Sequence, residues 1–319
     1  MKKKAALNEK SLLERLWIQK GMQAFALAGI AYLLVFNVTP MAGLIISFKH
    51  YRLETGLWGM FTSPWAGFSH FIEFFSEYNF PMLLRNTVMI SLLKLIFTFP
   101  VPIIFAIALN EVHSVKIRRI VQTASYLPYF ISWVVVSGFC VLFLNTRNGM
   151  INSLLLRFGA VEKPVNFLAS AGTYWAIAVI TGIWKEMGWW AILFLAAIAG
   201  IDPELYEAAI IDGAGRFKRI LYITIPGILP TIMVVLILSI GNLFGGSMGG
   251  SNFDQSFLLG NAGNNAASDI IQTYVFRIGL SQGRYDYAAA VGLLQSIVSV
   301  ILIFISNNLS KRLTGNGLY

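Results

Sequence analysis

Residues 202–230 have the sequence DPELYEAAIIDGAGRFKRILYITIPGILP, which is the most polar helical-looking run in the second half of a strongly apolar chain. The run lies between two apolar segments, each of which is long enough to cross a bilayer. A polar run in such a place is typical of a loop that contacts something outside the membrane. We therefore predict that this loop receives mechanical force from a partner.

The composition indicates an all-α integral membrane protein. Of the 319 residues, 56% are hydrophobic and 12% are charged, whereas soluble domains carry about 25% charged residues. The mean hydropathy is +0.67. The apolar runs are continuous, whereas strands of a membrane barrel alternate apolar and polar residues, so the spans are predicted to be helices. The net charge of +9 is typical of cytoplasmic anchoring charge and does not indicate a nucleic-acid partner.

Six apolar segments are predicted to be transmembrane helices. Together they form a membrane domain over residues 21–310, which follows an N-terminal segment, 1–20, and precedes a tail, 311–319. We expect prolines to bend or interrupt the first three segments, at Pro40, at Pro100 with Pro102, and at Pro128. The six segments cover residues 22–48, 83–109, 120–144, 173–200, 228–244 and 287–308.

The distribution of basic residues predicts the orientation of the chain. The N-terminal segment, the turn 111–119, the polar loop 201–226 and the tail carry fourteen lysines and arginines. The opposite loops, 49–82, 145–172 and 245–285, carry seven. Because cytoplasmic segments carry the excess of Lys and Arg, we expect both termini and the polar loop in the cytoplasm. The aromatic-rich loop 49–82 is expected to hold a short helix at the outer membrane surface.

The polar loop is predicted to form a helix, a turn and a second helix. Asp202 suits the N-cap, the proline after it suits the first turn, and Glu204 suits the positive end of the helix dipole. We expect this helix to end near Asp212, where Gly213 permits a sharp turn. A second short helix is expected over 216–222. An ordinary amphipathic connector would explain the charges, but not the small residues that cluster here.

The loop also carries a motif with fixed spacing. Glu207-Ala208-Ala209 is followed after three residues by Gly213, and after nine more by the sequence ITIP at 223–226. This pattern resembles the EAA loop of permeases from binding-protein-dependent ABC importers, except that isoleucine replaces the usual leucine before the proline. The resemblance implies a type I ABC importer permease fold, with a coupling helix that docks on a cytoplasmic ATPase. It assigns coupling to Glu204, Glu207, Ala208, Ala209, Asp212, Gly213 and Arg216.

Further stretches narrow the family. They are VQTASYLPYFISW at 121–133, GMIN at 149–152, WAGF at 65–68 and NFDQ at 252–255. These are similar to the polysaccharide and complex-oligosaccharide branch of the maltose-type permeases, and the resemblance covers nearly the whole chain. The glycine-rich insert 245–251 is longer than this branch leads us to expect. The resemblance implies a bacterial inner-membrane complex with a second, usually distinct, six-helix permease and an extracytoplasmic solute-binding protein.

The sequence predicts a transport subunit without catalytic residues of its own. The printed sequence contains no phosphate-binding loop of the form GxxxxGK[ST]. We therefore expect no cofactor in this chain, and expect ATP and Mg²⁺ to bind to a partner ATPase dimer. No metal site is expected either. The single cysteine, Cys140, has no partner for a disulfide or a metal and is predicted to be a small core residue.

Polar and aromatic residues in the apolar segments are candidates for the cargo path, because ionisable groups are costly in a bilayer. The adjacent Lys185 and Glu186 point about 100 degrees apart on a helix. A structural role remains open for each candidate, since cations pair or snorkel and tryptophans also serve as packing. A modestly positive path suits an acidic saccharide such as a uronate oligomer. The candidates are Arg85, Lys94, Trp184, Lys185, Glu186, Trp189, Asn242 and Gln295.

Two other functions fit less well. A secondary transporter driven by an ion gradient would need inverted repeats and acidic residues at the membrane midplane, and only Glu186 qualifies. An intramembrane hydrolase would need a Ser–His or metal arrangement within the spans. His50, His70 and His113 instead fall in loops or at the ends of spans. The sequence therefore favours the importer permease.

Overall fold

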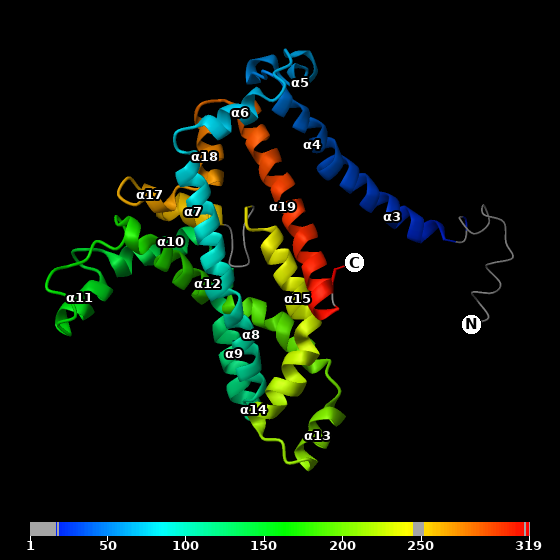
Figure 1. Ribbon diagram of the computed structural model, residues 1–319, viewed down its shortest axis with the longest axis vertical. Helices are drawn as coiled ribbons and strands as arrows, with labels where there is room; N and C mark the ends of the chain where they lie inside the picture. Colours follow the sequence, from blue (N-terminus) through cyan, green and yellow to red (C-terminus); the bar gives the residue numbers. More distant parts are fainter. Residues whose placement is uncertain (1–16, 18, 245–251, 316, 319) are drawn as a thin grey trace.

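The computed structural model describes residues 17, 19–244, 252–315 and 317–318, and most of this part is helical (Figure 1). Most of the N-terminal segment and the glycine-rich insert 245–251 lie outside the described residues. Five described helices are long and apolar enough to cross a membrane, and a bent pair gives a sixth candidate span. This confirms the predicted all-α membrane fold. The five are Lys20–Phe48, Phe80–Asn110, Ala171–Ala199, Arg216–Gly241 and Tyr285–Arg312.

The first span is a chain of four helical pieces. They are α3 (Lys20–Leu33), the π-helical η1 (Leu34–Val38), α4 (Thr39–Ala42) and the 3₁₀ piece η2 (Gly43–Phe48). The helix type changes around Pro40 and Gly43, where the sequence predicts a bend or break. In Figure 1, α3 and α4 lean away from the other helices, and every residue of α3 is exposed or half-buried. Such an apolar surface suits contact with lipid or another membrane protein.

The second span contains a π-helical turn where prolines are predicted to interrupt it. It consists of α7 (Phe80–Leu93), η4 (Lys94–Thr98) and α8 (Pro100–Asn110). A proline ring clashes with the carbonyl group four residues earlier, and a widened turn relieves that clash. The predicted interruption is confirmed, and it turns the buried Lys94 and Thr98 towards the interior.

The third span is broken by a sharp elbow. Helices α9 (Val115–Phe130) and α10 (Trp133–Leu144) meet at 99° across the two residues 131 and 132. The predicted bend at Pro128 is wrong in position, because Pro128 lies inside α9 and the break follows it. Ser132 caps the new helix by accepting a hydrogen bond from the Val135 amide at 3.4 Å.

A lysine from another span occupies the inner side of the elbow. Lys185 of α12 (Ala171–Ala199) is buried. Its Nζ donates to the carbonyl oxygens of Pro128, Tyr129 and Ile131 at 3.4, 2.6 and 2.5 Å. The last carbonyl groups of a helix have no intrahelical partner and carry the negative end of its dipole, so a cation stabilises them.

Close packing of α9 on α12 depends on Gly188. A Cβ atom at this position would lie 2.1 Å from the carbonyl oxygen of Ser125. The absent side chain therefore lets the two helix backbones approach each other, as small residues do at many membrane helix contacts.

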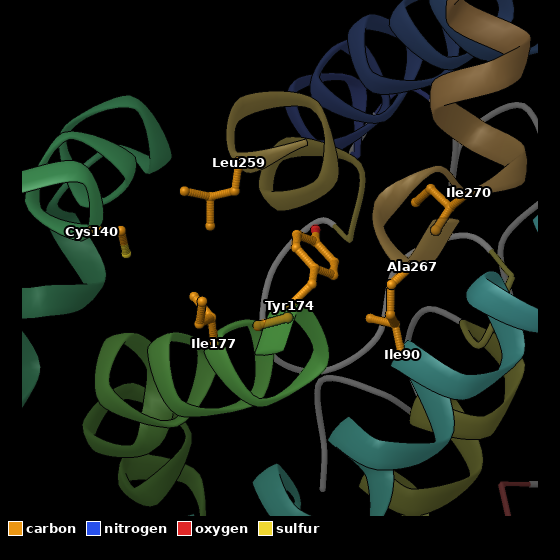
Figure 2. Packing of buried hydrophobic residues seen from close by; sticks show 8 residues of the cluster. Ile90, Cys140, Tyr174, Ile177, Leu259, Ala267 and Ile270 are labelled. Atoms are coloured by element: carbon orange, nitrogen blue, oxygen red, sulfur yellow. The ribbon is translucent and has the colours of Figure 1, made fainter. Parts of the chain in front are cut away.

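The region after the fifth span is largely helical, and most of its residues are buried or half-buried. Residues 252–281 form α16 (Asn252–Leu259), α17 (Asn265–Ser268), α18 (Ile271–Phe276) and the π-helical η6 (Arg277–Ser281). The segment predicted as an outer loop, 245–285, thus contains four short helical pieces in its described part. Figure 2 shows why these pieces fold inward: Leu259, Ala267 and Ile270 join a core with Tyr174 and Ile90. Their asparagines and serines find polar partners inside, as described below.

The polar loop lies at one end of the molecule, opposite the short helices α5 (Gly59–Thr62) and α6 (Ser69–Ser76) (Figure 1). It contains α13 (Pro203–Ile211) and then α14 (Arg216–Arg219), η5 (Ile220–Thr224) and α15 (Ile225–Gly241). Residues 216–222 are helical, as predicted, but this helix continues into the fifth span, which therefore begins at Arg216 rather than at 228. The widened turn η5 again precedes a proline, Pro226, and accommodates its ring.

Three elements complete the described chain. They are η3 (Leu53–Thr55), α11 (Met150–Arg157) and the long last helix α19 (Tyr285–Thr314). Together with α5 and α6, η3 confirms the predicted short helical structure in the loop 49–82. A bidentate ion pair joins this loop to the last span. It forms between Glu73 of α6 and Arg284, the residue before α19, and Arg284 Nη2 lies 2.7 Å from Glu73 Oε2.

We predict that Gly188→Ala lowers the free energy of unfolding in detergent by about 1–3 kcal/mol, the usual cost of overpacking. The added methyl group has no room against the Ser125 carbonyl. Gly138→Ala is the matched control, since Gly138 also lies within a helix but has nothing within 4 Å of an added Cβ. Equal midpoints of thermal unfolding for the two variants would contradict the packing argument.

We also predict that Lys185→Met destabilises the protein by about 1–3 kcal/mol, because three carbonyl groups lose a charged donor. Proteolysis at residues 131 and 132 should become faster than in the wild type. Lys116→Met, at an exposed position of α9, is the control. An unchanged proteolytic rate in Lys185→Met would show that the lysine does not hold the elbow.

Candidate functional site

The candidate coupling helix, α13, is defined at both ends by the features that the sequence predicts. Asp202 Oδ1 accepts a hydrogen bond from the Glu204 amide at 3.0 Å, which is a standard N-cap. At the other end Gly213 has a φ of +74°, and the amide of Ala214 donates to the carbonyl of Ala209 at 2.8 Å. This left-handed C-terminal turn favours glycine. The predicted cap and turn are therefore both confirmed.

The surface of α13 combines acidic, small and large apolar side chains. Glu204, Glu207 and Ala208 are exposed, and Ala209 is half-buried. Ile211 and Phe217 are 85% and 88% exposed, although they lie in the most polar part of this half of the chain. Large apolar side chains at such exposure on a projecting loop are typical of a protein contact. The sequence pattern draws attention to the small residues and gives no reason to select Ile211 and Phe217.

The base of this loop is tied to the rest of the protein. The hydroxyl groups of Tyr206 and Thr224 lie 3.0 Å apart and join α13 to the start of the fifth span. Arg216 points towards the turn that precedes α9. Its guanidinium lies 4.0 Å from the Glu111 carboxylate and 3.3 Å from His113 Nε2. Arg216 therefore connects the polar loop to the turn before α9.

The candidate cargo-path cations Lys94 and Lys185 are both buried, and both lie within electrostatic reach of Glu186. Lys94 Nζ donates to Asn252 Oδ1 at 2.7 Å, and Asn252 Nδ2 donates to Ser91 Oγ at 3.0 Å. Glu186 accepts from the indole of Trp190 at 3.2 Å. The structure therefore buries three of the predicted charged residues and gives each of them polar partners inside the protein.

Helix α16 extends these interior polar contacts, which the sequence does not predict. Gln255 Nε2 donates to the Ala178 carbonyl at 3.0 Å and to Thr181 Oγ1 at 2.8 Å. Tyr174 donates to Ser256 Oγ at 3.0 Å. The sequence signal for these contacts is the polar run NFDQS at 252–256. It points to interior partners only when the helix is known to fold back between the spans.

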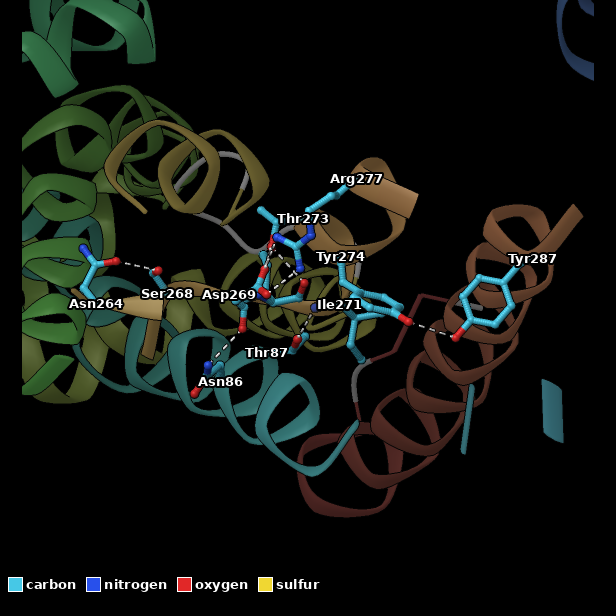
Figure 3. Close-up of polar contacts among 11 residues, drawn as sticks. Asn86, Thr87, Asn264, Ser268, Asp269, Ile271, Thr273, Tyr274, Arg277 and Tyr287 are labelled. Atoms are coloured by element: carbon cyan, nitrogen blue, oxygen red, sulfur yellow. Dashed lines mark hydrogen bonds and ion pairs between the residues drawn. The ribbon is translucent and has the colours of Figure 1, made fainter. Parts of the chain in front are cut away.

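Arg85 lies apart from these residues, near the N-terminal end of α7. Its guanidinium donates to the carbonyl of Ala266 at 2.5 Å and lies 5.7 Å from the ring of Trp175, yet the residue remains exposed. Figure 3 shows a neighbouring contact between α7 and the segment that joins α17 to α18, in which Asn86 donates to the Asp269 carbonyl at 2.9 Å. Arg277 pairs with the Asp269 carboxylate at 2.7 Å on the same side.

The remaining candidates are dispersed. Trp189 is 37% exposed and stacks on Tyr129 at 4.4 Å, while Trp184 is 42% exposed. Asn242 is exposed after the fifth span, and Gln295 donates to the Phe244 carbonyl at 3.3 Å. Cys140 is buried in the core with Ile177, as predicted for a structural cysteine (Figure 2).

Comparison with known proteins identifies the family. Residues 98–315 match the model of the binding-protein-dependent transport system inner membrane component. The chain is 42% identical to Protein LplB of Bacillus subtilis (strain 168), over 94% of this chain and 91% of that protein. It is 40% identical to the polygalacturonan/rhamnogalacturonan transport system permease protein YteP of the same organism, over 97% of this chain and 94% of that protein.

A solved structure agrees with these matches. A chain of the bacterial alginate ABC transporter, in complex with an alginate pentasaccharide-bound periplasmic protein, superimposes with a TM-score of 0.86 at 36% identity, over 97% of this chain and all of that one. The fold expected from the resemblance, that of an ABC importer permease, is therefore confirmed. The chain belongs to the family of inner membrane components of binding-protein-dependent transport systems and is a transport subunit rather than an enzyme.

Proposed function

We propose that this chain forms, with a second and distinct six-helix permease, the membrane path of an ATP-driven importer for an acidic oligo- or polysaccharide. The observation that carries the importer mechanism is the exposed helix α13, which bears the EAA motif and ends in the left-handed turn at Gly213. A solute-binding protein delivers the saccharide on the outer side. The inclusion of a periplasmic protein in the related alginate structure supports this partner.

In this proposal α13 docks on a cytoplasmic ATPase dimer, which binds ATP and Mg²⁺. Closure of the ATPase pair pushes the helix, and the cavity between the two permeases alternates its opening. The exposed Ile211 and Phe217 supply apolar contact area beside the acidic positions. The docking surface consists of the residues assigned to coupling, which are Glu204, Glu207, Ala208, Ala209, Asp212, Gly213 and Arg216.

The proposed orientation has both termini and α13 in the cytoplasm of a bacterial cell, with α5 and α6 outside. The two-to-one bias of basic residues supports it. The location of α13 at the opposite end of the helices from α5 and α6 is consistent with it (Figure 1). The exposed apolar length of α3 supports contact with lipid and with the second permease.

The proposed cargo is a uronate-containing saccharide. One relative is named as a permease for polygalacturonan and rhamnogalacturonan, and a related structure is described as an importer of the acidic polysaccharide alginate. Among the proposed path residues, Arg85 is the exposed cation that a carboxylate can reach. The proposed path comprises Arg85, Lys94, Trp184, Lys185, Glu186, Trp189, Asn242 and Gln295.

Gly213→Val is predicted to abolish most saccharide uptake, because valine strains the φ of +74° and displaces the docking helix. ATP-dependent uptake into proteoliposomes, with the amount of inserted chain measured in parallel, tests this. The matched control is Gly159→Val, which strains a φ of +68° in equally open space far along the chain from α13. Glu207→Ala should also lower uptake without removing the chain from the membrane. Normal uptake by both α13 variants would refute the role of this helix.

Arg85→Gln is predicted to raise the apparent KM for a galacturonate oligomer by about tenfold or more, the cost of one charge-assisted contact. The chain should insert at the wild-type level, because Arg85 is exposed. Arg147→Gln serves as the control at another exposed basic position predicted to lie outside. If the two variants transport the oligomer alike, Arg85 is not part of the cargo path.

A further inference from the structure

Two of the three histidines, His50 and His70, lie side by side near one end of the molecule, next to Asp286 from a distant part of the sequence. His50 follows the first span, His70 lies in α6, and Asp286 lies in the first turn of α19. One candidate ligand atom from each residue lies within 4.8 Å of the other two. Three separate segments of the chain therefore contribute metal-binding side chains to one place, an arrangement that the sequence does not predict.

His70 is the central member of this group and is only 3% exposed. Its Nε2 lies 3.0 Å from the carbonyl oxygen of Lys49 and 3.5 Å from Asp286 Oδ2. Its Nδ1 is buried and has no hydrogen-bond partner among the described residues. A buried polar atom without a partner costs free energy, so the ring is arranged as if a further ligand belongs beside it.

The donor set favours a late transition metal. Two imidazoles and one carboxylate suit Zn²⁺ and its neighbours, whereas Ca²⁺ and Mg²⁺ require six or more oxygen ligands. His70 offers its unpartnered Nδ1 as the ligand atom, because Nε2 donates to the carbonyl oxygen of Lys49 at 3.0 Å. A hydrogen bond from the second ring nitrogen is the usual support of a metal-binding histidine.

The surroundings permit a cation to enter. His50, His70 and Asp286 all line a cavity of about 1180 Å³, which gives access from the surface and room for a water ligand. The nearby Arg284 is already neutralised by Glu73, and this hydrogen bond lowers the pKa of the Glu73 carboxyl. Lys49 donates its ammonium group to the carbonyl of Phe61. Neither cation therefore competes for Asp286 by direct pairing.

Asp286 is held in place from the other side. Its Oδ1 accepts a hydrogen bond from the amide of Tyr287 at 2.8 Å, which leaves Oδ2 directed at His70. Hydrogen bonds of this kind fix the orientation of a metal-binding carboxylate.

We propose that His50, His70 and Asp286 form a site for a divalent late transition metal such as Zn²⁺. Bound there, the metal fastens the first outer loop to the start of the last span, beside the Glu73–Arg284 ion pair. This proposal is independent of the nature of the cargo.

Titration of the chelator-treated, full-length chain with Co²⁺ in mild detergent tests the site. The wild type should bind one Co²⁺ per chain with visible d–d absorption, and Zn²⁺ should displace it. His50→Gln should weaken binding at least about tenfold, and His70→Gln should do the same. Because His50 is exposed, its replacement leaves the fold intact, so a loss of binding reports on the site itself.

Thermal unfolding provides a second measurement. Zn²⁺ should raise the unfolding temperature of the wild type and of His113→Gln, the control histidine in the turn before α9, but not that of His50→Gln. Absence of saturable Co²⁺ binding by the wild type would overturn the proposal. Equal binding and equal Zn²⁺ stabilisation in His50→Gln and His113→Gln would overturn it as well.

Discussion

A helix that ends inside an apolar environment leaves carbonyl groups without partners, and this constraint determines how the rest of the protein is arranged. The elbow between α9 and α10 is the clearest case, because Lys185 donates to the carbonyl oxygens of Tyr129 and Ile131 there. Lys185 reaches them only because Gly188, one turn further along α12, lets the two helices approach closely. A sharp turn within a span is thus stabilised by a buried polar side chain that hydrogen-bonds its carbonyl groups.

The same reasoning changes how the intramembrane charges are interpreted. Lys94 is completely buried and donates to Asn252 of α16, which in turn donates to Ser91. Helix α16 carries its own polar groups into the interior, where Gln255 and Ser256 also find partners on α12. A lysine in a span is therefore accounted for by a polar helix that folds back beside it. Conversely, Arg85 is exposed, so part of its side chain is accessible to a ligand, which supports its proposed role in binding carboxylates.

The sequence was sufficient for features that depend on local chemistry. The cap at Asp202, the turn at Gly213 and the π-helical turn before Pro100 all follow from the properties of Asp, Gly and Pro. It was insufficient where distant segments decide the outcome. The helices within 252–281 lack long apolar runs and fold inward because the spans offer them polar partners. Likewise, the elbow follows Pro128 rather than coinciding with it. The lysine that stabilises the elbow lies more than fifty residues away, so the local sequence does not give the position of the break.

The continuity of the fifth span bears on how force would travel from the coupling loop. From Arg216 to Gly241 the chain is helical throughout, without the flexible joint that a separate second helix would introduce. The hydroxyl contact between Tyr206 and Thr224 ties α13 to this rod near its beginning. Further along, Ile228 and Val235 pack in the core with Phe194 of α12. In the proposed mechanism, a displacement of α13 is therefore transmitted along the continuous helix of the fifth span to the packed interior. A flexible joint after α13 would instead absorb the displacement.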